Sequence, residues 1–204
     1  MQCSDARDKI LVIACGAIAR QLVHIRNLNQ WDHIELQCLP SELHNQPGHI
    51  PLAVEAKIKT QASLYRKIFI AYADCGTGGA LDKVLKAYGI ARIPGAHCYE
   101  FFTGSEKFHA LAESEPGSFY LTDFLTRHFE RLVIKGLGID RLPQLKSVYF
   151  KNYKRLVYLA QTQSEELHDM ARNHALKLDL NYEYHYCGSG PLSRVLKPAL
   201  EPPH

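Results

Sequence analysis

The feature that most constrains the fold is a short apolar run near the start of the chain. Residues 9–14 read KILVIA and are followed directly by Cys15-Gly16. A continuous run of β-favouring residues that ends at a turn signal is typical of a strand buried on both faces of a parallel sheet. Apolar residues between positions 17 and 25 then recur at near-helical spacing. The segment therefore predicts a strand, a tight turn and a helix.

The same order of elements recurs along the first half of the chain. We expect further strands at 34–39 and 67–73, a short one at 91–93, and helices at 52–65 and 80–88. Repeated strand-then-helix order favours parallel strands joined by right-handed crossovers. The predicted fold class is α/β, with an open, mainly parallel Rossmann-like sheet, helices on both faces and a helical C-terminal elaboration.

After Gly117 the pattern becomes mainly helical. We expect helices at 120–134, 145–160, 164–178 and 191–200, and a late strand at 181–186. Thr122 and Asp123 are suitable caps for the first of these helices. The predicted organisation is an N-terminal tail (1–8), a single α/β domain (9–196, with its strand–helix repeats in 9–117 and a mainly helical part in 118–196) and a Pro-rich tail (197–204).

Composition narrows the class of protein. A chain of 204 residues with 46% apolar residues can bury a full core, and its net charge of +3 includes no basic block typical of a nucleic-acid arm. The first nine residues are polar, and no apolar run approaches the roughly 18 residues of a membrane span. We expect a cytoplasmic protein that binds neither nucleic acid nor membrane. In that reducing compartment, six cysteines favour metal binding or catalysis over a disulfide framework.

Three cysteines follow predicted strands. Cys15 and Cys75 come directly after two of them, and Cys98 follows the short strand at 91–93. Ligands of open α/β sheets bind beyond the carboxyl ends of the strands, so we expect these thiols to share one crevice. Cys15 and Cys75 each precede a glycine and a helix start, where backbone N–H groups favour the thiolate that binds metal or attacks a substrate. Because closely spaced cysteine pairs are absent from the sequence, the prediction depends on this topology.

The loop after the third strand reads DCGTGG, residues 74–79. Its glycines Gly76, Gly78 and Gly79, together with Gly16, allow the backbone to approach a cofactor closely, and Thr77 adds a hydroxyl. The loop matches neither the P-loop nor the dinucleotide-binding fingerprint. We treat these residues as candidate cofactor contacts.

Two histidines and two acids complete the candidate site. His44, in the loop after the second strand, and His97, beside Cys98, are candidates for a fourth ligand or a proton carrier. Asp74 and Glu100 flank the cysteines and are candidate acid/base groups. For all four the structural alternative is a capping or solvated side chain.

Several of these motifs occur together in one known family. They are Ala14-Cys15-Gly16-Ala17, Leu43-His44-Asn45, Tyr72 to Gly79, His97-Cys98-Tyr99-Glu100, Leu121-Thr122-Asp123 and Val157 to Thr162. With them the chain resembles, over roughly residues 9–196, the bacterial and archaeal family called domain of unknown function 1638. Some relatives are encoded near corrinoid-dependent methyltransferase systems, so the resemblance implies a role in methyl-group or one-carbon metabolism. It supplies no catalytic residues.

Four functions are consistent with these residues. The first is a metal-dependent enzyme of small-molecule metabolism in which Cys15, Cys75 and Cys98 hold a [4Fe–4S] cluster, leaving one iron for a small-molecule substrate. The second has Zn²⁺ in the same place, with His97 or His44 as fourth ligand. The third is a metal-free cysteine-pair acid/base enzyme, and the fourth a non-enzymatic accessory protein that binds a corrinoid protein or methyltransferase. The number of cysteines favours the cluster, while the sequence does not predict the oligomeric state.

Overall fold

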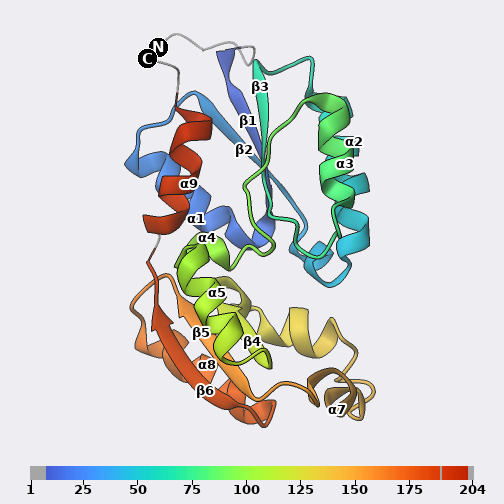
Figure 1. The fold of residues 1–204 in the computed structure, drawn as a ribbon, viewed down its shortest axis with the longest axis vertical. Coiled ribbons are helices and arrows are strands. Elements are labelled where there is room, and N and C mark those ends of the chain that lie inside the picture. Colours follow the sequence, from blue (N-terminus) through green and yellow to red (C-terminus); the bar gives the residue numbers. More distant parts are fainter. Residues whose placement is uncertain (1–7, 189, 202–204) are drawn as a thin grey trace. The chain divides into compact units, whose positions relative to one another are not determined.

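The computed structural model of the chain describes residues 8–188 and 190–201, and it confirms the α/β class. It contains two open, three-stranded, parallel sheets with helices around them (Figure 1). The chain divides into two compact units, each with one of these sheets. The first unit runs to Cys98 and resumes at Ser193, and the second is Tyr99–Leu192. That residues 9–196 form a single domain stays a prediction.

The first sheet has the order β2-β1-β3, as Figure 1 shows. Its strands are β1 (Ile10–Cys15), β2 (Ile34–Leu39) and β3 (Lys67–Ala71). All six residues of β1 are buried, as expected for the apolar run that forms the central strand. The strand predicted at 91–93 is reduced to a single parallel bridge between Ile70 and Arg92.

Helices cover both sides of this sheet. The connecting elements are the 3-10 turn η2 (Gly16–Ile18), α1 (Ala19–Leu28), the 3-10 turns η3 (Ser41–Asn45) and η4 (Pro47–His49), α2 (Ile50–Gln61) and α3 (Ala80–Tyr88). In Figure 1, α1 lies on one side of the sheet, and α2 and α3 lie on the other. The chain leaves β1 toward β2 and then crosses to β3 on the opposite side of β1. The carboxyl ends of β1 and β3 therefore form a topological switch point, where open α/β sheets bind their ligands.

The second sheet has the order β4-β5-β6. Its strands are β4 (Ser118–Thr122), β5 (Arg155–Ala160) and β6 (Asn181–Tyr186). The helices of this unit are α4 (Glu100–Thr103), α5 (Ser105–Ser114), α6 (Asp123–Arg127), the π-helix η5 (Glu130–Lys135), α7 (Leu145–Phe150) and α8 (Glu165–Lys177). Apolar residues of β5, α6, η5 and α8 form the main core of the unit.

Two predicted helices were wrong in part. Residues 120–122 belong to β4, and residues 155–160 form β5, the central strand of the second sheet. In the first case strand and helix meet without a loop: Thr122 ends β4, and its hydroxyl accepts a hydrogen bond from Leu125 N at 3.3 Å, so that α6 begins at Asp123. The predicted cap at Thr122 is confirmed, but the helix lies entirely after it.

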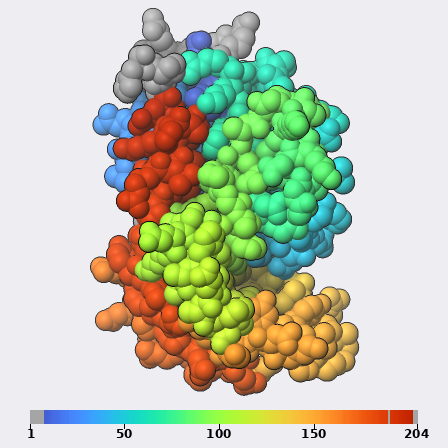
Figure 2. All heavy atoms as spheres, in the orientation of Figure 1, coloured from blue at the N-terminus to red at the C-terminus, as the bar shows by residue number. Residues whose placement is uncertain are grey.

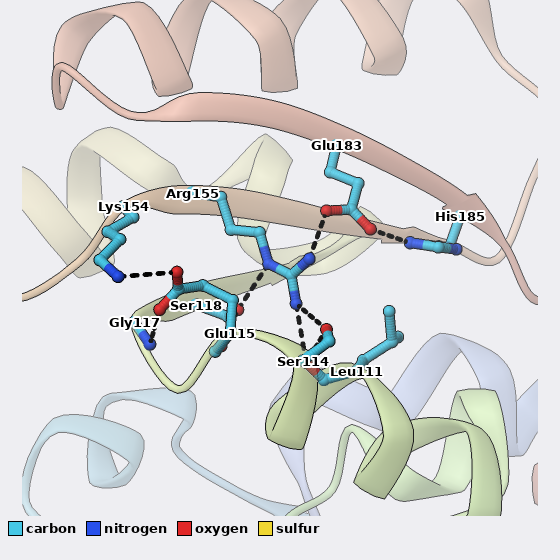
Figure 3. Close-up of polar contacts among 9 residues, drawn as sticks. All are labelled: Leu111, Ser114, Glu115, Gly117, Ser118, Lys154, Arg155, Glu183 and His185. Carbon is cyan, nitrogen blue, oxygen red and sulfur yellow. Dashed lines mark hydrogen bonds and ion pairs between the residues drawn. The ribbon is translucent and has the colours of Figure 1, made fainter.

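Arg155 joins the first residues of this sheet to helix α5 (Figure 3). Its Nε donates to Ser118 Oγ and its Nη1 to Glu183 Oε2, both at 2.7 Å. Its Nη2 donates to Leu111 O at 2.7 Å and to Ser114 Oγ at 2.9 Å. One guanidinium therefore links β4, β5, β6 and α5.

A buried carboxylate joins β4 and β5 at their other ends. Asp123 Oδ1 accepts hydrogen bonds from Tyr158 Oη at 2.8 Å and Gln161 N at 2.9 Å. Its Oδ2 accepts from Thr162 N at 3.0 Å and Thr162 Oγ1 at 2.7 Å. The carboxylate thus holds the residues that follow β5 against the start of α6.

The last helix, α9 (Gly190–Leu200), includes Pro198. Residues 197–200 of the predicted Pro-rich tail are therefore helical, whereas residues 1–7 and 202–204 of the two predicted tails lie outside the described residues. Two carbonyls at the end of α9 interact with residues near the starts of β2 and β3. Leu200 O lies 2.9 Å from His33 Nε2, and Ala199 O accepts a hydrogen bond from Lys67 Nζ at 2.8 Å. In Figure 2 the red spheres of α9 lie against blue spheres of residues early in the chain.

Among residues 8–188 and 190–201, no helix combines the length and apolarity that a membrane span requires.

Candidate thiol site

Cys15 ends the central strand of the first sheet in a buried position. The residue is 8% exposed, and its Sγ accepts a hydrogen bond from Ala17 N at 3.4 Å, which caps η2. Gly16 follows because the chain passes close to the end of β2: a β-carbon there would lie 3.0 Å from Leu39 O and 3.4 Å from Ser41 N. A larger residue at Gly16 would therefore press on the end of β2, and the role of Gly16 as a cofactor contact stays a prediction.

The DCGTGG loop that follows β3 pairs with the segment leading to Cys98. Asp74 N donates to Gly95 O at 3.1 Å, and Cys75 N donates to Ala96 O at 2.9 Å. Cys75 has a φ of +50°, which L-residues rarely adopt. These two backbone hydrogen bonds bring the regions of Cys75 and Cys98 together.

Asp74 organises this loop. Its carboxylate accepts hydrogen bonds from Thr77 Oγ1 at 2.7 Å, Gly79 N at 2.8 Å and Gly78 N at 3.0 Å. Burial alone would raise the pKa of Asp74, but these hydrogen bonds hold it below its usual value. Two glycine N–H groups predicted to contact a cofactor thus donate to Asp74, and Gly76, at φ +81°, lies against Pro47. Roles for these residues in catalysis or cofactor binding stay predictions.

The three cysteines line one small cavity. Its lining comprises Cys15, Cys75, Cys98, Tyr72, His44 and apolar atoms of Ile18, Ile50 and Ala71. Its volume is about 10 Å³, which is about the space that one water molecule needs. Thiols from three separate loops therefore line one cavity, and their role as metal ligands stays a prediction.

The thiols differ in their ionisation because their surroundings differ. A hydrogen bond from the Cys98 thiol lowers the pKa of Cys75, although burial opposes this. The same hydrogen bond, together with burial, raises the pKa of Cys98 well above its usual value. Burial raises the pKa of Cys15 to about 11. Cys75 is therefore the thiol of this cavity that ionises most readily.

The donor atoms are not arranged as a finished metal site. Within the described ranges 8–188 and 190–201, no group of three or more His, Cys, Asp or Glu side chains has that geometry. The five cysteines of the described part of the chain are all free thiols.

Tyr72 is a cavity residue that sequence reasoning missed. It directly follows β3, is 2% exposed and lines the cavity together with Cys15, and its buried hydroxyl has no hydrogen-bond partner among the described residues. Burial, and then the proximity of Cys15, raise the pKa of Tyr72, so the phenol stays protonated. The sequence could have indicated Tyr72 by its position, because it is the one residue with a polar side-chain group between the apolar strand and the DCGTGG loop.

Of the two predicted histidines, His44 lines the cavity. It lies in η3, after β2, where desolvation by the surrounding protein and the proximity of His97 lower its pKa. His44 is therefore neutral at neutral pH, which is the form that binds a metal or accepts a proton. Glu100 belongs to the second unit, where it is buried in α4 with its Oε2 3.9 Å from His109 Nε2; its predicted role stays a prediction.

Replacing His97 by glutamine is expected to raise the pKa of His44 toward its usual value, because the variant removes the neighbouring imidazole whose proximity lowers that pKa. Imidazole resonances followed by NMR through a pH titration of metal-free protein would measure the change. His49→Gln, in the neighbouring turn η4, is the matched control. An unchanged His44 titration in His97→Gln would contradict the interaction.

Comparison with known proteins places most of the chain in one family. A family model described as "Protein of unknown function (DUF1638)" matches residues 38–196. Neither the curated proteins nor the solved structures include a match to the chain. The matched range includes Cys75, Cys98 and His44, whereas Cys15 precedes it.

Proposed function

The chain belongs to the DUF1638 family, as its resemblance to that family predicted, and we propose that it is a metal-dependent enzyme of small-molecule metabolism. Because the function of this family is unknown, the proposal is argued from the site itself. Cys15, Cys75 and Cys98 would provide the ligands. The observation that supports the proposal most directly is that three thiols from separate loops line one cavity at the switch point of the first sheet. Thiolates bind zinc, copper(I) and iron–sulfur clusters strongly.

Metal binding at this site requires two changes. The thiols have to shift, because their donor atoms are not preformed as a metal site in the described residues. Cys15 and Cys98, whose pKa values are raised, have to lose their protons. Since metal binding then releases protons, affinity is expected to increase with pH across the neutral and alkaline range.

The size of the cavity favours a single ion over a cluster. A volume of about 10 Å³ holds one atom-sized occupant, so a [4Fe–4S] cluster would require the loops to separate further. A Zn²⁺ ion could take the three thiolates and His44, the histidine that lines the cavity. When bound, zinc would lower the pKa of a thiol or water for methyl transfer or hydrolysis.

The [4Fe–4S] cluster remains the second candidate. It is favoured by the ratio of donors, three cysteines to one histidine in the cavity lining, because clusters are held mainly by thiolates. A connection with corrinoid-dependent or one-carbon methyl transfer rests on the family resemblance alone.

The experiment is a metal and sulfide analysis of the full chain purified without oxygen. We expect close to one zinc ion per chain without sulfide in the wild type. In Cys75→Ser the affinity for added Zn²⁺ should fall by at least about 100-fold, since even residues that only support metal ligands contribute about 10–100-fold. Cys38→Ser is the matched control, because Cys38 is an exposed thiol in β2.

The other outcomes discriminate between the remaining functions. Iron with a similar amount of sulfide, lost in Cys75→Ser, would identify the cluster. If the wild type neither contains metal nor binds added zinc or a reconstituted cluster under reducing conditions, the metal proposal is wrong. The thiols would then act as a metal-free pair, or the chain as an accessory protein of a corrinoid system.

A further inference from the structure

We propose that Cys75 and Cys98 form a redox-active pair that a low-molecular-weight disulfide oxidises to an intramolecular disulfide, and that this oxidation and metal binding exclude each other. The first part stands on the arrangement of the two loops. The second part rests on the proposed function, because it treats both cysteines as metal ligands.

The backbone places the two sulfurs together. Cys75 N is hydrogen-bonded to Ala96 O at 2.9 Å, and Cys98 follows Ala96 by only two residues. Both cysteines line the same cavity of about 10 Å³, and the interaction of their thiols lowers the pKa of Cys75 and raises that of Cys98. A disulfide, whose sulfur–sulfur distance is about 2.05 Å, would therefore join two residues that already line one cavity.

The other described cysteines are engaged or placed differently. The Cys15 sulfur is buried and accepts a hydrogen bond from Ala17 N at 3.4 Å, whereas the Cys187 thiol donates to His185 O at 3.6 Å. Cys38 is exposed on β2. Cys75 and Cys98 are both partly exposed.

The oxidation proceeds by two thiol–disulfide exchanges. The Cys75 thiolate attacks one sulfur of the external disulfide, forms a mixed disulfide and releases one thiolate. The Cys98 sulfur then attacks the Cys75 sulfur of the mixed disulfide and releases the second thiolate. The protons of the two cysteines end on the released thiols, so two protein thiols are oxidised while one external disulfide is reduced to two thiols.

The exclusion follows from the shared sulfurs. A disulfide between Cys75 and Cys98 removes two of the three proposed thiolate ligands, and Cys15 alone cannot hold the ion. A bound ion in turn occupies both sulfurs and prevents their attack on the external disulfide. Oxidation should therefore release the metal, and the metal should slow oxidation.

The test uses glutathione disulfide as the oxidant and the metal-free full chain. Samples are quenched with acid, alkylated and mapped by mass spectrometry for the wild type, Cys98→Ser and Cys38→Ser. We expect a Cys75–Cys98 disulfide in the wild type and in Cys38→Ser. In Cys98→Ser the reaction should stop at a glutathione adduct on Cys75, and Cys98→Ala, checked for folding by circular dichroism, should give the same adduct.

Saturation with Zn²⁺ before the oxidant is added should slow disulfide formation in the wild type by at least tenfold. A wild-type protein that accumulates the Cys75 adduct without closing the disulfide, or that pairs Cys15 instead, would overturn the redox pair even if zinc binds. Rapid disulfide formation that zinc does not slow would overturn the exclusion. Failure to bind either zinc or a reconstituted cluster, with the disulfide still forming, would leave the pair standing and refute the metal function.

Discussion

Substitution of Asp123 by alanine is expected to lower the free energy of unfolding of the second unit by at least about 3 kcal/mol, because each buried donor left without a partner costs about 1–3 kcal/mol. The side chain is 5% exposed, and its carboxylate accepts four hydrogen bonds. Two of the donors are the backbone N–H groups of Gln161 and Thr162, which the variant cannot reorient without moving the end of β5. Asp123→Asn should recover little of the lost stability. Its amide replaces one of the two accepting oxygens by an NH₂ group, which cannot accept the hydrogen bonds that this oxygen received.

Urea unfolding and hydrogen exchange of the β5 amides would measure the loss. Asp169→Ala is the matched control, because that side chain is 69% exposed on α8 and its closest ion-pair distance to Arg172 is 3.7 Å. Its effect should stay within about 0.5 kcal/mol. Equal stabilities for the two variants would show that the Asp123 network does not hold the strand ends together.

Substitution of Arg155 by methionine is expected to cost about 2–3 kcal/mol, because hydrogen bonds to a charged group contribute about 1.5–3 kcal/mol and several are lost at once. The guanidinium is 16% exposed, and the variant leaves Glu183 and Ser118 without their shared partner (Figure 3). Arg155→Lys should recover only part of the loss, since an ammonium cannot reproduce the planar fork of donors.

The neighbouring residue provides the control. Lys154 is 71% exposed and pairs with Glu115 at 3.0 Å, so Lys154→Met should cost no more than about 1 kcal/mol. Denaturant unfolding of the two variants and of the wild type makes the comparison. If Lys154→Met lowers the stability as much as Arg155→Met, the importance assigned to the hydrogen bonds of Arg155 is wrong.

Much of the first sheet was predictable from the sequence. The six buried residues of β1 form a continuous apolar run, which few structures other than a central parallel strand accommodate. In the second unit, short apolar segments fit strand and helix equally well. Only four residues, none of them glycine or proline, separate α7 from β5, so the end of a predicted helix could not be distinguished from a separate strand.

The candidate site was predictable as far as topology determined it. Cys15 and Cys75 follow strands whose order puts their ends side by side, and this alone indicated a shared cavity. The pKa values of Cys75 and Cys98 were not predictable, because they depend on burial and on the interaction between the two thiols in the folded protein. The bonds by which Asp74 shapes its own loop likewise require the folded backbone.

The first unit is discontinuous in sequence, and this has a consequence for synthesis of the chain. The second unit lies wholly between Cys98 and Ser193, so the ribosome completes it before most of α9 has been made. At about 5–20 residues per second, the roughly 100 residues from Cys98 to Leu200 take about 5–20 s to make. During that interval the first sheet lacks the helix whose last carbonyls His33 and Lys67 bind, although every residue that lines the thiol cavity has already been made.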